Sequence, residues 1–168
     1  MGEVAFRIEE FREVKKAFRG TVIDVDYGET PFGMTGRPDI PRRSQLCIMI
    51  ASPDYTKPQY EWYVPSNKKK TKWAYLIEGL QMSGAMNDMV IIGDTPEEKI
   101  RSFADNLVGM EFDWEEREVE ILAGRTTDCL IPVIYYGRKS KEEVEKLREA
   151  VKKGKIVEEE IAEEEVKL

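Results

Sequence analysis

A segment near the middle of the chain combines positive charge with aromatic side chains. It runs from Arg37 to Tyr75 and has eight basic residues and three acidic ones, whereas the whole chain of 168 residues has a net charge of −7. Lysine and arginine side chains contact the phosphates of a nucleic acid, and aromatic rings stack on its unpaired bases at about 1–3 kcal/mol each. This mixture is therefore typical of single-stranded nucleic-acid binding. The basic residues are Arg37, Arg42, Arg43, Lys57, Lys68, Lys69, Lys70 and Lys72, and the aromatic ones are Tyr55, Tyr60, Trp62, Tyr63, Trp73 and Tyr75.

Several of these residues also suit a purely structural role. Trp73 shares helical spacing with Leu76 and Leu80, which favours packing in the core. The lysine run 68–70 fits a solvated turn as well as a phosphate-binding patch. On the strand expected around Tyr60, alternation separates Tyr60 and Trp62 from Tyr63.

Strand alternation yields one specific expectation about these rings. Tyr60 and Trp62 share a face with Val64, whereas Tyr63 shares the other face with Glu61. A face shared with valine is typical of the interior, and one shared with glutamate is typical of the solvated side. We therefore predict that Tyr63 stacks on bases and that Trp62 packs in the core.

Enzymatic chemistry finds little support in the sequence. There is no histidine, which removes the commonest general base and metal ligand. Asp24 and Asp26 could hold Mg²⁺, but solvent-facing polar residues fit the same pattern. Asp94 with Glu97 and Lys99 loosely resembles a nuclease motif, yet Thr95-Pro-Glu-Glu is a helix start, where such acids do not converge. We expect no enzymatic activity, no cofactor and no metal.

Compartment and source are inferred from composition. Cys47 and Cys129 lie within apolar runs without metal-ligand spacing, so we expect two buried thiols. No apolar run is long enough to cross a bilayer, and residues 1–10 lack the apolar region of a signal peptide, which favours the cytoplasm. The bias towards Glu, Lys and Arg, with only three Asn and three Gln, suggests a thermophilic archaeal or viral source.

The elements that must position these residues follow from periodicity and turn signals. Residues 1–17 fit either a strand or a helix, and 27–43 is a long loop with three Gly and three Pro. Strands are expected near 18–26, 45–51, 60–64, 108–122 and 129–136. Helices are expected near 73–83, ending at Gly84, at 95–107, and from Ser140 to Gly154, the last two starting with capping boxes.

Three strands, a helical crossover and two further strands is the element order of the OB-fold, a five-stranded, partly open barrel. We therefore predict an α+β fold with an OB-fold-like barrel, a two-helix crossover joined by residues 83–94, and a C-terminal helix. The expected division is an OB-fold-like domain at 1–137 and a C-terminal helix with an acidic tail at 138–168.

Three segments also resemble a known family. They are Gly20-Thr-Val-Ile-Asp-Val, the stretch from Lys69 to Leu80, and Leu107-Val-Gly-Met-Glu-Phe. Together they resemble archaeal and phage OB-fold proteins related to single-stranded DNA-binding protein and replication protein A. The resemblance spans about Phe18 to Gly137 and implies a barrel that binds single strands in a groove.

The predicted function is therefore non-catalytic binding of single-stranded nucleic acid, most readily DNA, in an OB-fold groove. The expected contact residues are Arg37, Arg42, Arg43, Tyr55, Lys57, Tyr63, Lys68, Lys69, Lys70 and Lys72. The alternative is an OB-fold subunit that binds protein within a replication, repair or viral assembly, using the C-terminal helix and tail. No membrane partner is expected, and the sequence leaves DNA versus RNA and the oligomeric state open.

Overall fold

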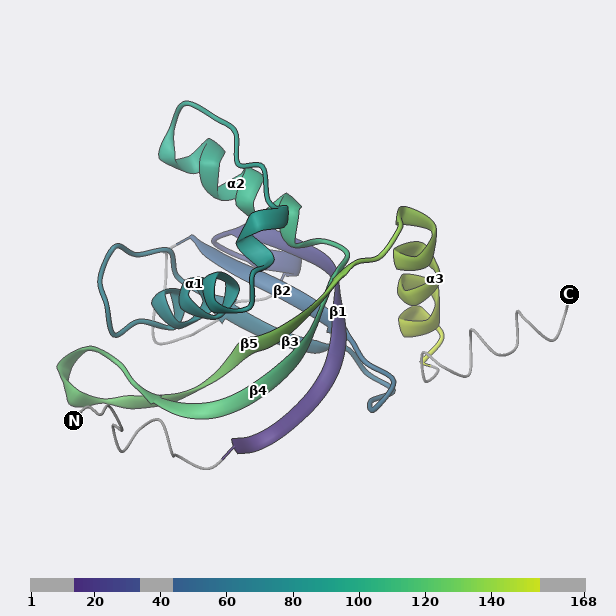
Figure 1. Cartoon of the computed structure of the whole chain (residues 1–168), viewed down its shortest axis with the longest axis horizontal. Helices are drawn as coiled ribbons and strands as arrows, with labels where there is room; N and C mark the ends of the chain where they lie inside the picture. The colour runs from purple at the N-terminus through teal and green to yellow at the C-terminus, as the bar shows by residue number, and fades with distance from the viewer. Residues whose placement is uncertain (1–13, 34–43, 155–168) are drawn as a thin grey trace, which may run out of the picture.

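Five antiparallel strands form one sheet in the order β3-β2-β1-β4-β5 (Figure 1). The computed structural model describes residues 14–33 and 44–154. With three helices beside the sheet, the α+β class predicted from the sequence is confirmed. The strands are β1 (Val14–Gly28), β2 (Gln45–Ala51), β3 (Gln59–Tyr63), β4 (Met110–Glu120) and β5 (Thr126–Arg138).

The long strand β1 has a different partner in each half. Its first half pairs with β4, its second half pairs with β2, and Thr21 belongs to both ladders. Gly20 precedes this point, and a Cβ atom there would lie 2.6 Å from the Ile50 side chain. Its carbonyl accepts a hydrogen bond from Trp114 Nε1 at 3.1 Å. Glycine is therefore required here for β1 to approach β2 closely.

The helices begin within one residue of the predicted starts, and two of them have the predicted capping boxes. They are α1 (Lys72–Met82), α2 (Pro96–Leu107) and α3 (Lys141–Lys152). In α2 and α3 the N-cap hydroxyl accepts from the backbone of a glutamate, whose carboxylate accepts from the cap backbone in return. Helix α1 stops just before Gly84, whose φ of 84° is readily adopted only by glycine.

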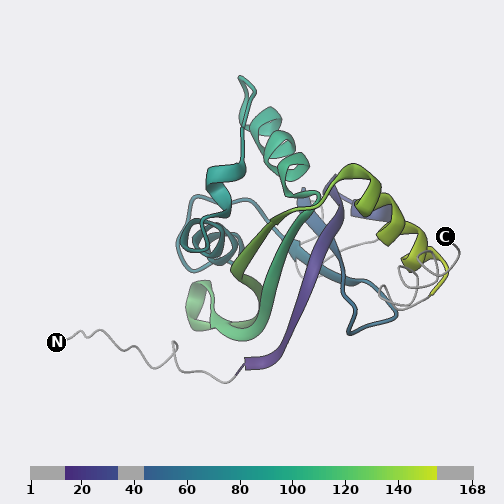
Figure 2. The ribbon, with the colours of Figure 1, turned by 45° about the vertical axis from the view of Figure 1, so that its right-hand side comes forward.

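Helices lie on both sides of the sheet (Figures 1 and 2). Helix α1 approaches β5 so closely that a Cβ on Gly79 would be 2.5 Å from the Pro132 carbonyl oxygen. The main core fills the space between the sheet and α1, with buried Ile48, Leu76 and Trp114 among its members. None of the helices within 14–33 and 44–154 is long and apolar enough to span a membrane.

Helix α3 packs on the outer surface of β1 and β2. Val144 and Leu147 form a second, small core with Ile23 and Ala51. Arg148 reinforces the contact, because its Nε donates to the Ile23 carbonyl at 2.8 Å. The apolar face of this helix is thus used within the chain itself, which bears on the prediction that it recruits a partner.

Candidate nucleic-acid interface

The two faces of β3 have different surroundings. The β2–β3 register places Tyr63 opposite Leu46, and Trp62 opposite Cys47. Leu46 belongs to the main core, so Glu61 and Tyr63 point inward with it. Tyr60 and Trp62 point to the outer surface and are half-buried.

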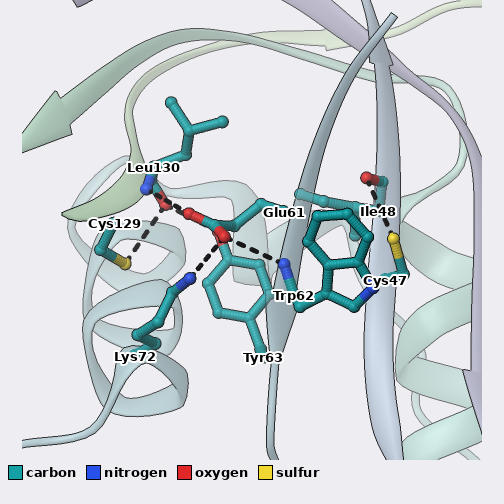
Figure 3. Close-up of polar contacts among 8 residues, drawn as sticks. All are labelled: Cys47, Ile48, Glu61, Trp62, Tyr63, Lys72, Cys129 and Leu130. Carbon is teal, nitrogen blue, oxygen red and sulfur yellow. Dashed lines mark hydrogen bonds and ion pairs between the residues drawn. The ribbon is translucent and has the colours of Figure 1, made fainter. Parts of the chain in front are cut away.

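On the inner face, Glu61 and Tyr63 connect β3 to β5 and α1 (Figure 3). The Glu61 carboxylate accepts hydrogen bonds from Lys72 Nζ, from the Trp62 backbone N–H at 3.0 Å and from the Leu130 N–H at 2.8 Å. The Tyr63 hydroxyl donates to the Leu130 carbonyl oxygen at 2.6 Å. We call Glu61, Tyr63, Lys72 and Leu130 the inner clamp.

The inner clamp corrects two predicted contact residues. Tyr63 is fully buried, so the prediction that its ring faces solvent is wrong. Burial also raises its pKa well above the ordinary value of 10.0, which keeps the hydroxyl protonated. The prediction for Lys72 is also wrong, because only 8% of its side chain is exposed and its ammonium pairs with Glu61. Neither side chain is positioned to meet a strand in solution.

The outer face carries a row of three aromatic rings instead. Tyr60 and Trp62 are stacked, with centroids 6.0 Å apart and planes at 27°. Phe32, in the short 3-10 turn η2 (Pro31–Gly33), meets Tyr60 edge-on at 6.2 Å. We call Phe32, Tyr60 and Trp62 the aromatic strip. The core role predicted for Trp62 is therefore wrong as well.

Phe32 is held in the strip by Asp26. Its φ of 56° is unusual for a residue with a side chain and costs about 1–2 kcal/mol. The Asp26 carboxylate accepts from the Phe32 backbone N–H at 2.6 Å. Asp26, weighed above as a magnesium ligand, is thus a backbone acceptor, and Asp24 similarly accepts from the Val25 N–H.

Trp62 has an indole N–H that is buried and without a hydrogen-bond partner in the described part of the chain. Figure 3 shows the ring on the side of β3 opposite Tyr63, beside Cys47. Buried donors almost always have an acceptor, so an indole N–H without one among the described residues is an exception.

Exposed lysines lie beyond both ends of β3. Lys57 precedes the strand, and Lys68 to Lys70 follow it in the turn that leads to α1. Lys70 is partly engaged, since its Nζ lies 3.2 Å from Glu120. The strand that carries Tyr60 and Trp62 is thus flanked by cations.

The other predicted contact residues are elsewhere. Tyr55 is half-buried and packs edge-on against Phe18 at 5.4 Å, with Lys16 5.4 Å from its ring. Arg37, Arg42 and Arg43 lie outside the described residues. Of the ten predicted contacts, Lys57 and the lysines 68–70 are the ones that the structure leaves exposed around β3.

Both cysteines are buried free thiols, as predicted. Burial, followed by the nearby carboxylates of Glu61 and Asp26, raises the pKa of Cys47 to about 12. The thiol therefore stays protonated and behaves as a small apolar group. Among residues 14–33 and 44–154, no group of three or more potential metal ligands is present.

The sequence did contain a signal for the correct face of β3. Lys72 stands at the start of the helix that follows β3, within reach of a glutamate on its inner face. An internal carboxylate needs such a cation, so Glu61 and Lys72 together could have indicated an inward-pointing pair. The role of Phe32 had no comparable signal, because it depends on a backbone conformation within a loop.

The structure thus defines an α+β protein with an open five-stranded antiparallel sheet and an outer aromatic strip. Comparison with known proteins adds no relative, because no family model, no curated protein and no solved structure matches the chain.

Proposed function

We propose that the chain is an OB-fold protein that binds single-stranded DNA on the outer surface of β2 and β3. The strand order β3-β2-β1-β4-β5 supports the fold, because it is that of a five-stranded barrel opened between β3 and β5. The inner clamp joins these two edges through side chains. The crossover helices between β3 and β4 also fit this architecture.

The observation that carries the proposal is the aromatic strip. In OB-folds the surface of the second and third strands is where oligonucleotides bind, and the strip lies on it. Three rings offer stacking surfaces for on the order of two or three bases, each worth about 1–3 kcal/mol.

Phosphates are assigned to the exposed lysines at the ends of β3. Lys57 precedes β3, and Lys68 and Lys69 follow it, so the proposed path of the strand runs along the aromatic strip between them. The remaining surface is rich in acidic residues, and their negative charge repels the phosphates of a nucleic acid from the other faces of the protein. The proposed activity is binding without catalysis, through backbone charge and stacking rather than through the reading of base edges.

The proposal is tested by titrating the protein with a dT oligonucleotide while following tryptophan fluorescence. We expect quenching, and affinity that falls with salt at a log–log slope of about −0.7 for each phosphate neutralised. Trp62→Ala lacks the tryptophan that reports binding, so it is followed by the anisotropy of a labelled dT oligonucleotide, and it should weaken binding by about 1–3 kcal/mol. Tyr136→Ala is the matched control, because Tyr136 is an exposed ring stacked on Arg19 elsewhere on the sheet.

Two results would overturn the proposal. One is the absence of any binding at low salt. The other is equal loss of affinity in Trp62→Ala and Tyr136→Ala, which would show that the aromatic strip has no special part. A double lysine variant, Lys68→Ala with Lys69→Ala, should lower the salt slope while leaving the quenching by stacked bases in place.

A further inference from the structure

Three consecutive β-branched residues lie exposed between the two crossover helices. Val90, Ile91 and Ile92 are 73%, 41% and 69% exposed. They follow the 3-10 turn η3 (Ala85–Asp88) and precede α2. In both ribbon views α2 and the segment before it project away from the sheet (Figures 1 and 2). We call Val90–Ile92 the apolar segment.

The apolar segment is held in place by polar side chains of α2. Asn106 accepts from the Val90 N–H at 3.1 Å and donates to the Val90 carbonyl at 2.9 Å. Ser102 accepts from the Ile92 N–H at 3.0 Å. Val90 and Ile92 are two residues apart, and both hydrogen-bond to α2 through their backbone groups. This pattern is that of an extended chain with one edge against the helix. Its conformation is therefore fixed although its side chains are exposed.

The opposite edge of the segment is free. In an extended chain the backbone groups of Ile91 point away from those of Val90 and Ile92, hence away from α2. Within the described part of the chain, neither the N–H nor the C=O of Ile91 has a backbone partner. An ordered edge of this kind is what an added peptide strand pairs with.

The charged residues around the apolar segment indicate which kind of partner it would bind. Between Asp88 and Leu107 there are five exposed acidic residues and two basic ones. One of the two, Arg101, lies over the Tyr27 ring at 5.5 Å. Exposed apolar side chains with an acidic surround are complementary to a segment that combines apolar and basic residues.

We infer that the apolar segment is a docking site for an extended, apolar and basic segment of a partner protein, which pairs at Ile91 and covers Val90 and Ile92. This site is separate from the aromatic strip and does not depend on the proposed binding of single strands. It is carried by residues of the crossover, whereas the strip is carried by β3 and η2.

The test uses the full chain and a labelled peptide of alternating valine and lysine, with a valine–glutamate peptide as its counterpart. Fluorescence anisotropy should show binding of the basic peptide and little of the acidic one. Val90→Ser with Ile92→Ser should weaken binding at least tenfold without lowering the melting temperature, because both side chains are exposed. Ile134→Ser is the matched control, since Ile134 is 49% exposed on β5, and should leave the affinity unchanged.

A third variant tests whether the fixed conformation matters. Asn106→Ala keeps the apolar side chains but removes the bonds to Val90, and should also weaken peptide binding. The inference is overturned if neither peptide binds, if the Ile134 control loses as much affinity, or if the segment's variants instead abolish self-association. In every variant the affinity for dT should stay as in the parent protein, which separates this test from that of the aromatic strip.

Discussion

Glu61 on β3 accepts a hydrogen bond from the backbone N–H of Leu130 on β5, with 2.8 Å between the two atoms. Among the described residues no backbone ladder joins these strands. The Leu130 carbonyl is also satisfied from β3, by the Tyr63 hydroxyl. Side chains thus take the place of main-chain bonds between the two edge strands.

Glu61→Ala should strongly destabilise the protein. It removes the partner of the Lys72 ammonium inside the core, and breaking a buried ion pair from one side typically costs about 3–5 kcal/mol. The double variant Glu61→Leu with Lys72→Met removes both charges and should recover part of that loss. Urea unfolding of the three proteins measures this. If the double variant were less stable than Glu61→Ala, the loss in Glu61→Ala could not be attributed to the Lys72 ammonium left buried without a partner.

Tyr63→Phe should cost about 1–3 kcal/mol of stability and leave the affinity for dT unchanged. It keeps the ring but leaves the buried Leu130 carbonyl with only the weak donor of the Cys129 thiol. Thermal unfolding and the fluorescence titration separate the two effects. A loss of binding at unchanged stability would mean that the inner face takes part in recognition.

Asp26→Ala should weaken binding of dT severalfold, because Asp26 accepts from the backbone N–H that fixes the Phe32 ring. Asp26→Asn retains an acceptor oxygen and serves as the control, with near-parental affinity expected. The two variants also differ in their effect on the surface charge. Tighter binding by both would show that removal of a negative charge outweighs the positioning of Phe32.

Acid should loosen the starts of α2 and α3. Backbone N–H groups of Thr95 and Asp94 lower the pKa of Glu98 below its ordinary value of 4.5, and those of Ser140 do the same for Glu143. A carboxylate whose pKa is lower in the folded state than in the unfolded state stabilises the fold. This stabilisation is fully present above about pH 4.5 and is lost as the pH falls through the folded-state pKa.

The measurement is the melting temperature between about pH 6 and pH 3. Glutamine can replace glutamate in a capping box, so Glu98→Gln with Glu143→Gln should fold. Its acid-induced decline in melting temperature should be shallower than that of the parent. Parallel curves for the two proteins would contradict the assignment to these carboxylates.

The elements themselves were predictable because local chemistry marks them. The strand predicted at 45–51 coincides with β2, and both capping boxes start the helices where expected. These signals depend on neighbours in sequence. The extent of β1 was not predictable, because its first half is defined by pairing with β4, far along the chain.

The strand β3 was predicted, but its two faces were assigned the wrong way round. Placing Tyr63 outside assumed that Glu61 is solvated, as most glutamates are. In the structure Glu61 is buried instead, because the Lys72 ammonium and the Leu130 N–H, both distant in sequence, compensate its carboxylate in the core. Burial of a charge is decided by partners in space, which alternation along one strand does not reveal.

The two ladders of β1 set an order in which the sheet can form during synthesis. The pairing of Thr21 with Ala51 is available as soon as β2 is complete, and β3 can then join. The pairing of Thr21 with Glu111 requires that both crossover helices have already been made. The first half of β1 is therefore an open strand edge on a growing chain. We expect this interval, rather than the folded state, to be when the protein is most exposed to aggregation.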